Sequence, residues 1–243
     1  MNTESRLQIW LKGLVLLALA TYFAFNIWTG NLANYINERF VWLSYLAVGL
    51  FVLLGIFTLL TLRSTEKAKR LNTDHAITWP ILAMSAVPLV VGVLIPSVPL
   101  GANAVNGNIS TRAVLNSNDS GSSFSIPPER RNVLDWLRAF SAADDLTAFD
   151  HQPVDVVGFV YRETDFDEDH FMVARFTVSC CVADASALGL PVYAADSDTL
   201  EAGQWVRVQG TLIAGEFRED VLPIVQAESL EVVQQPEHPY LYP

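Results

Sequence analysis

Long uncharged stretches constrain this chain more than any other feature of its sequence. Three such stretches are present: residues 13–37, 40–62 and 76–111. A membrane-spanning helix needs about 20 predominantly apolar residues, and each stretch provides them. We therefore expect a multi-pass membrane protein with three spans, at about Leu7–Trp28, Val41–Leu62 and Ile77–Leu100.

The basic residues between the spans predict their orientation. The loop 63–75 contains four basic residues, whereas the loop 29–39 contains only Arg39. Because basic residues are enriched in cytoplasmic loops, we expect the amino terminus and the loop 63–75 to lie in the cytoplasm. Three spans then place the residues beyond about 100 outside the cell membrane.

The first span has an alternative interpretation as a signal peptide. The tripeptide Ala18-Leu19-Ala20 resembles a small-residue cleavage site, but the apolar stretch continues to Trp28, which favours a retained span. No acidic, basic or histidine side chain lies deep inside any expected span. Such groups mark the ion pathways of transporters, so the sequence argues against a chain that transports a solute by itself.

The two parts of the chain differ sharply in charge. Residues 1–99 carry a net charge of +3, whereas residues 100–243 carry −14 and contain no lysine. Nucleic-acid binding requires clustered Lys and Arg, which excludes nucleic acid as the partner of the acidic part. Residues 101–127 are rich in Asn, Ser and Gly, a composition typical of a flexible linker. We expect an extracytoplasmic domain over residues 128–243.

The pattern of this outer domain predicts one helix followed by short strands. Apolar residues at helical spacing over Glu129–Ser141 predict a helix that covers the open end of a sheet. From Pro153 the apolar period becomes two, which favours an OB-like small barrel, with a sandwich as the alternative. We expect Gly158 and Gly210 to relieve crowding at the positions where the strands curl. The expected strands are Pro153–Arg162, Phe171–Ser179, Pro191–Ala195, Trp205–Leu212, Val221–Gln226 and Ser229–Val233.

Cys180 and Cys181 are the two cysteines of the chain and are adjacent. Three interpretations are open: two small buried residues, a strained vicinal disulfide, or thiolates that bind a zinc-like metal ion or form a redox pair. Successive side chains of a strand point to opposite faces, so both sulfurs can face one ion only if the strand ends near Cys180. Further ligands could come from Asp184, then His170 and His151, and Asp184 has an alternative role as the cap of a helical turn over residues 185–188.

The acidic segment Thr164–His170 is interpreted as a solvated turn. Loose Ca²⁺ binding is the alternative, although the segment lacks the glycine and the terminal glutamate of an EF-hand loop. The sequence contains no motif of nucleophilic hydrolases, zinc proteases, P-loop NTPases or dinucleotide-binding enzymes. We therefore expect no catalytic residues and no enzymatic activity.

The segment FMVARFTVSCCVADASALGLPVYA, followed by WVRVQGTL, resembles a bacterial family of accessory subunits of two-component permeases. The resemblance covers nearly the whole chain, including the spans, the spacer and the outer β-domain. It implies a larger polytopic permease subunit as partner, and it assigns no catalytic residues. Links of some members to metal or stress responses favour metal binding at Cys180 and Cys181.

These patterns are compatible with three functions. The first is a non-enzymatic accessory subunit in the lipid bilayer, whose outer domain binds or senses a solute or metal ion through Cys180, Cys181 and Asp184. The second is a membrane-tethered metal or haem chaperone that acts without a permease, with His238 in a mobile tail. The third is a thiol-redox protein, which the acidic surroundings disfavour because they stabilise the protonated thiol.

Overall fold

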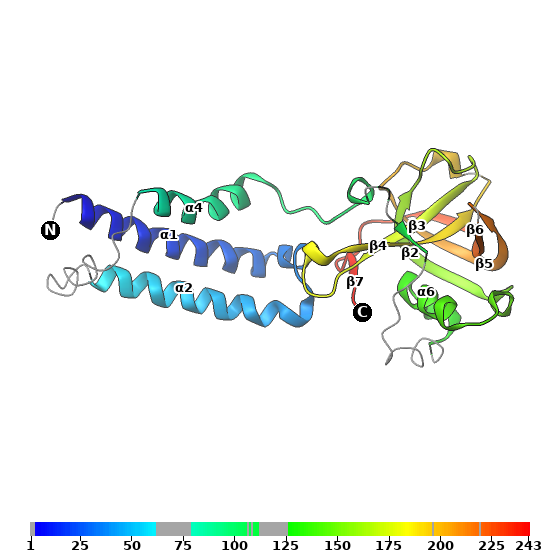
Figure 1. Cartoon of the computed structure of the whole chain (residues 1–243), viewed down its shortest axis with the longest axis horizontal. Coiled ribbons are helices and arrows are strands. Elements are labelled where there is room, and N and C mark those ends of the chain that lie inside the picture. The colour runs from blue at the N-terminus through cyan, green and yellow to red at the C-terminus, as the bar shows by residue number, and fades with distance from the viewer. Residues whose placement is uncertain are drawn as a thin grey trace. The chain divides into compact units, whose positions relative to one another are not determined.

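The chain folds into two compact units, Met1–Val98 and Pro99–Pro243. Figure 1 shows helices in the first unit and a β-sheet in the second. The structure, a computed structural model, describes residues 3–61, 79–105, 107, 109–111, 126–195, 197–218 and 220–243. The loop 63–75, on which the expected orientation depends, lies outside the described residues.

The first unit contains two helices that are long and apolar enough to cross a membrane. They cover the stretches Arg6–Trp28 and Glu38–Thr61, and only 11% of the most apolar window of each is buried. These stretches agree with the first two expected spans. Among the described residues, the α-helices of this unit are α1 (Thr3–Trp28), α2 (Val41–Thr61) and α4 (Trp79–Leu94).

Close packing of small residues joins α1 to α2. A Cβ atom on Gly13 would lie 2.7 Å from the Leu59 side chain, and one on Gly55 would lie 2.9 Å from Leu17. This crossed pattern makes the two helices antiparallel, as Figure 1 shows. Small residues that allow such an approach are typical of helix interfaces in lipid, where packing rather than water drives association.

The third apolar helix is shorter than the expected span Ile77–Leu100. It comprises the 16 residues Trp79–Leu94, and the chain is not helical from Pro96 to Leu100. A proline disfavours helical geometry at the residue before it, which explains an end close to Ile95. Residues 77 and 78 lie outside the described part. The Tyr22 hydroxyl of α1 donates a hydrogen bond to the Gly92 carbonyl of α4 at 3.1 Å.

The second unit is built on a mainly antiparallel sheet. Strand β2 pairs antiparallel with β3 and β5, β3 pairs antiparallel with β4, β4 pairs parallel with β6, and β6 pairs antiparallel with β5. The pairings therefore lead from β2 through β3, β4, β6 and β5 back to β2. The strands are β1 (Ile109–Ser110), β2 (Pro153–Tyr161), β3 (His170–Thr177), β4 (Ser186–Tyr193), β5 (Trp205–Phe217), β6 (Asp220–Val232) and β7 (Tyr240–Leu241).

Three strand predictions were wrong in detail. The strand expected to end at Leu212 continues to Phe217 as β5. The strand expected from Pro191 begins at Ser186 instead, and the last two expected strands form the single strand β6. Gln209 pairs with Ser229 but Gly210 pairs with Ala227, so one residue of β6 is left over. Such a bulge interrupts the alternation of apolar residues, which made one strand look like two.

Close backbone approach explains two glycines of the sheet, as the sequence predicted. A Cβ atom on Gly158 would lie 2.5 Å from the Ala174 carbonyl oxygen, and one on Gly210 would overlap the Gln226 carbonyl. Both glycines therefore allow neighbouring strands to pack more closely than any other residue would.

Part of the expected linker 101–127 belongs to the folded β unit. Ile109 in β1 pairs with Ala187 in β4, and Val105 is only 3% exposed in a buried cluster with Phe176. The described residues of this segment up to Thr111 thus contribute a strand and a core side chain. The segment 112–125 lies outside the described residues.

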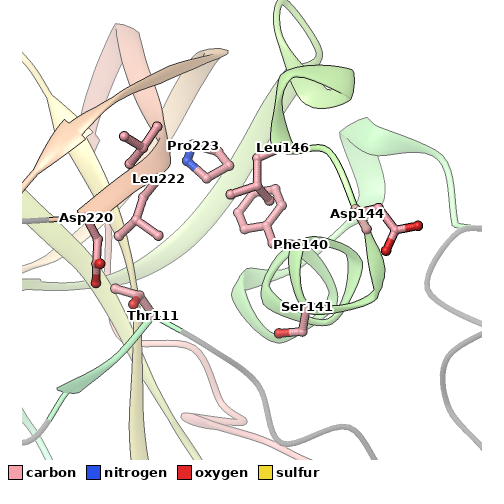
Figure 2. A pocket seen from close by; sticks show the side chains of 10 residues that line it. Thr111, Phe140, Ser141, Asp144, Leu146, Asp220, Leu222 and Pro223 are labelled. Carbon is pink, nitrogen blue, oxygen red and sulfur yellow. The ribbon is translucent and has the colours of Figure 1, made fainter.

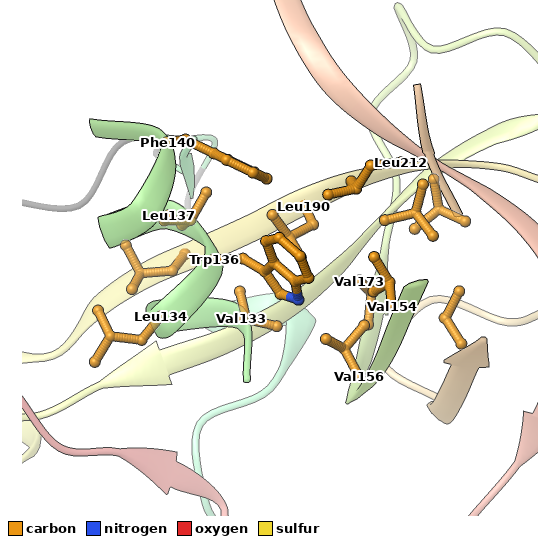
Figure 3. Packing of buried hydrophobic residues seen from close by; sticks show 14 of the residues in the cluster. Val133, Leu134, Trp136, Leu137, Phe140, Val154, Val156, Val173, Leu190 and Leu212 are labelled. Atoms are coloured by element: carbon orange, nitrogen blue, oxygen red, sulfur yellow. The ribbon is translucent and has the colours of Figure 1, made fainter. Parts of the chain in front are cut away.

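Helix α6 (Val133–Ala142) packs its apolar face into the core of the sheet, as its spacing predicted. It begins four residues later than expected, because Pro128–Arg130 form a separate 3-10 turn. Asn132 accepts a hydrogen bond from the Asp135 amide, and the Asp135 carboxylate accepts one from Asn132, which fixes the helix start. Figure 3 shows the resulting cluster, including Trp136, Leu137, Phe140, Val154, Val156, Leu190 and Leu212.

Candidate functional site

The two cysteines lie in the loop between β3 and β4, beyond the end of the strand. The Sγ atoms of Cys180 and Cys181 are 3.8 Å apart, and neither residue forms a disulfide. Cys180 is exposed and Cys181 is half-buried. The interpretation as buried core residues was therefore wrong for Cys180, and both cysteines are free thiols in this structure. Because β3 ends at Thr177, the two sulfurs lie beyond the strand and close together.

Asp184 organises this loop through its carboxylate. It accepts hydrogen bonds from the backbone amides of Ser179, Cys180 and Cys181, at 2.8, 2.7 and 3.4 Å. The expected cap of a helical turn over residues 185–188 was wrong, because β4 already begins at Ser186. Asp184 is instead the last residue of the 3-10 turn Val182–Asp184, and its carboxylate accepts a hydrogen bond from the amide of Cys181, the residue that precedes this turn. The two sulfurs and the Asp184 carboxylate thus belong to one short, ordered loop.

The electrostatics of the loop favour a protonated thiol. The hydrogen bond to the Asp184 carboxylate, and then the one to Cys181, raise the pKa of Cys180 to about 11. The same hydrogen bond from Cys180 and the backbone amides hold the pKa of Asp184 below its usual value. At neutral pH Cys180 donates and Asp184 accepts, so the pair lacks the lowered pKa of reactive redox cysteines.

His170 is not part of this group, contrary to expectation. It is the first residue of β3, whereas Cys180 follows the end of that strand. The strand between His170 and Thr177 spans roughly 23 Å at about 3.3 Å per residue. His170 therefore cannot bind the same ion as the cysteines.

His170 instead forms a second candidate group with two carboxylates of the acidic turn. Its Nδ1 atom lies 2.7 Å from Asp169 Oδ1 and 4.0 Å from Asp167 Oδ2. The imidazole ring packs against Tyr193 and Phe217, with ring centroids 5.3 and 6.1 Å away. Sequence spacing placed these residues near one another but gave no reason to separate them from the cysteines.

Arg175 has a role that the sequence did not indicate. Its guanidinium donates hydrogen bonds to the carbonyl oxygens of Val157, His238 and Pro239, at 3.2, 2.8 and 3.0 Å, and lies over the Trp205 ring. Arg175 is only 7% exposed, and its burial lowers its pKa to about 10. It therefore fixes the carboxy-terminal segment.

The carboxy-terminal segment is ordered and does not form the expected mobile tail. Phe176 and Thr177 of β3 pair with Tyr240 and Leu241 of β7, and the Val178 amide donates to the Leu241 carbonyl. This pairing extends β3 up to the cysteine loop.

A groove between α6 and the start of β6 was missed by the sequence analysis. Figure 2 shows Phe140 and Leu146 facing Leu222 and Pro223 across it, and its volume is about 510 Å³. The residues from the two sides are about 80 positions apart in the sequence, and only the fold brings them together.

Two family descriptions match consecutive parts of the chain. The DUF1980 N-terminal domain matches residues 11–110, and the DUF1980 C-terminal domain matches residues 117–243. The chain belongs to the DUF1980 family. This result confirms the resemblance drawn from the segment around Cys180 and Cys181.

Relatives of this DUF1980 protein match it over nearly their full length. A protein of Streptococcus mutans named "Putative two-component membrane permease complex subunit" is 22% identical over 93% of this chain and 97% of its own length. The UPF0703 protein YcgQ of Bacillus subtilis is 21% identical over 94% of this chain and 98% of its own. Both units of the chain are thus shared with these relatives.

Among solved structures, a small single-stranded DNA-binding protein from Streptomyces coelicolor matches 34% of this chain and 93% of its own. The identity is 15% and the TM-score is 0.25. At this TM-score the match carries no conclusion about fold or ligand.

Proposed function

We propose that this protein is a non-enzymatic accessory subunit of a membrane permease complex, in which a larger polytopic partner supplies the pore. The observation that carries the proposal is the match, over both units, to a relative named as a subunit of such a complex. The two long apolar helices provide the membrane anchor that this role requires. The raised pKa of the Cys180 thiol disfavours a nucleophilic role for this residue.

The proposal includes α4 as a third, short span. Its 16 residues measure about 24 Å, against about 30 Å for the hydrocarbon core of a bilayer. Met84 and Leu94 are among its exposed apolar side chains, which suits contact with lipid or with a partner helix. With three spans, the amino terminus is cytoplasmic and the β unit lies outside the cell membrane.

We further propose that the outer unit is an OB-like barrel that binds or senses the solute. The closed circuit of pairings through β2, β3, β4, β6 and β5 supports this interpretation, as does the packing of α6 against the core. The exposed loop with Cys180, Cys181 and Asp184 provides sulfur and carboxylate ligands at the surface. A metal ion is therefore the solute that we favour.

Purification from native membranes tests the accessory role. The tagged full-length chain, extracted in a mild detergent, is expected to co-purify with one polytopic membrane protein in a fixed ratio. The same tag on an unrelated three-span protein is the control. A chain that is monomeric both in mild detergent and in membrane patches excised without detergent would contradict the proposal.

Site-directed labelling tests the orientation. In a background with Cys180→Ser and Cys181→Ser, we expect Ser141→Cys to react with a membrane-impermeant maleimide in intact cells. Lys67→Cys is expected to react only after permeabilisation. The opposite pattern, or labelling of both, would overturn the predicted topology.

A further inference from the structure

We propose that Cys180 and Cys181, in the loop that Asp184 organises, form an open two-sulfur site for a thiophilic cation such as Zn²⁺ or Cd²⁺, which the protein presents as cargo. The cargo role rests on the proposed permease function. The site itself rests on the geometry of the loop, and it can be tested without any partner.

The distance between the two sulfurs fits one tetrahedral ion. Two sulfurs that each bind zinc at about 2.3 Å in tetrahedral geometry lie about 3.8 Å apart. The Sγ atoms of Cys180 and Cys181 are 3.8 Å apart. A disulfide would require about 2.0 Å, so the loop holds the sulfurs at the separation of a chelate and not of a bond.

Asp184 positions the two sulfurs by ordering the loop that carries them. Its carboxylate already contacts the Cys180 thiol by a hydrogen bond, which a cation can replace when the thiol proton leaves to solvent. The backbone amides of Ser179, Cys180 and Cys181 hold this carboxylate in place. Hydrogen bonds of this kind orient a metal ligand and reduce the reorganisation that binding requires.

Both ends of the loop are anchored, so the two sulfurs are held near one another before an ion arrives. Thr177 of β3 pairs with Ser186 of β4 directly below the loop, and Val182 packs partly into a buried cluster. The loop is therefore a short connection on a rigid hairpin. Ligands on such a support bind with less loss of conformational freedom.

The number and exposure of the ligands indicate that the bound ion exchanges and has no permanent structural role. Structural zinc sites have four protein ligands, whereas a pair of sulfurs leaves part of the tetrahedral shell open for another molecule. Cys180 is exposed, so the open position faces solvent. A ligand from a permease could complete the shell and accept the ion.

Softness of the ligands predicts which cations bind. Thiolates select zinc-like and softer ions, whereas carboxylates and water suit magnesium and calcium. The group of Asp167, Asp169 and His170 has a different character, because two of its three ligands are carboxylates and Asp167 is 88% exposed. It lies at the opposite end of β3, so substitutions can separate the two groups.

The test is a titration of the reduced full-length protein in detergent with Cd²⁺ and, separately, Co²⁺. Both ions give thiolate-to-metal charge-transfer absorption when sulfur binds. We expect saturation at one ion per chain, unaffected by excess Mg²⁺. Cys180→Ser with Cys181→Ser is expected to abolish the absorption, and Asp184→Asn to weaken binding about 10- to 100-fold. The matched control His170→Ala is expected to leave affinity unchanged.

Several results would overturn the proposal. These are the absence of charge-transfer absorption with the reduced protein, binding that survives the double cysteine substitution, or binding that His170→Ala removes. Circular dichroism and size-exclusion chromatography of each variant identify losses caused by misfolding. The wild-type titration stands without any variant, so a variant that misfolds does not remove the test.

Co-purification of the partner, measured on the same preparations, separates this proposal from the accessory role. A chain that retains its partner but binds no Cd²⁺ overturns the cargo site and leaves the accessory role in place. A chain that binds Cd²⁺ through its cysteines but has no partner supports the site and contradicts the permease role.

Discussion

At the residue scale, Asp184 controls the chemistry of Cys180. Its carboxylate accepts a hydrogen bond from the thiol and raises the pKa of Cys180 to about 11. The thiolate, which is the nucleophile, is therefore a small fraction at neutral pH and rises about tenfold per pH unit below that pKa. The alkylation rate should follow this rise through pH 8 to 10.

Asp184→Asn should make Cys180 more reactive. The single amide oxygen can still accept the hydrogen bonds from Cys180 and Cys181, while the bond from Ser179 to the other carboxylate oxygen is lost. The substitution also removes the negative charge that stabilises the thiol proton. A pKa that falls towards the ordinary value of about 9 increases the thiolate at pH 8 by up to about 100-fold. The iodoacetamide rate, measured in a Cys181→Ser background with and without the substitution, tests this. Equal rates would show that Asp184 does not set the pKa.

Gly210 should tolerate no side chain. A Cβ atom there would overlap the Gln226 carbonyl, so Gly210→Ala must displace the backbone of β6, at a cost of about 1–3 kcal/mol. Gly101→Ala is the matched control, because no atom lies within 4 Å of its Cβ position. Thermal unfolding in detergent compares the two, and equal midpoints would contradict the close approach.

Replacing Arg175 by the other basic residue, lysine, should destabilise the protein. Lys cannot donate to three diverging carbonyl groups, so Arg175→Lys leaves buried acceptors unpaired and should cost about 1–3 kcal/mol. Arg207→Lys, at an exposed pair with Asp155, should cost less than about 1 kcal/mol. Hydrogen exchange should show lost protection at Leu241 only in the first variant. Unchanged protection there would mean that Arg175 does not hold the segment.

At the element scale, alternation of apolar residues predicted the sheet strands where β-branched residues are frequent. Pro153 begins β2 as predicted, and the β3 prediction was off by one residue at the start and two at the end. The first half of β4 was missed because its residues, Ser-Ala-Leu-Gly-Leu from Ser186, contain no β-branched side chain. The prediction divided β6 for a different reason, because the bulge opposite Gly210 interrupts the alternation of apolar residues.

The candidate site was only partly predictable from the sequence. Cys180, Cys181 and Asp184 were proposed together because they are close in the chain. Their separation from His170 follows from the length of β3, which the sequence predicted but which was not used to exclude this ligand. Arg175 donates hydrogen bonds to the carbonyl groups of His238 and Pro239, which lie more than 60 residues away in the sequence. Neither the periodicity of apolar residues nor the spacing of motifs predicts a contact over such a distance.

At the scale of the whole molecule, the chain combines an apolar helical unit with an acidic β unit. Residues 100–243 carry a net charge of −14, and the relatives share both units over nearly their full length. A helical unit without charged groups in its interior suits docking on a transport protein more than transport by itself. The acidic unit, with its exposed cysteine loop, suits the capture of cations.

Native mass spectrometry of the complex released from its own membranes tests this account most directly. We predict a species that contains the 26.8 kDa chain together with a larger polytopic protein. This species should also carry one zinc-like ion, which is lost after Cys180→Ser with Cys181→Ser. A chain that appears alone, with a mass unchanged by the double substitution except for the replaced atoms, would contradict it.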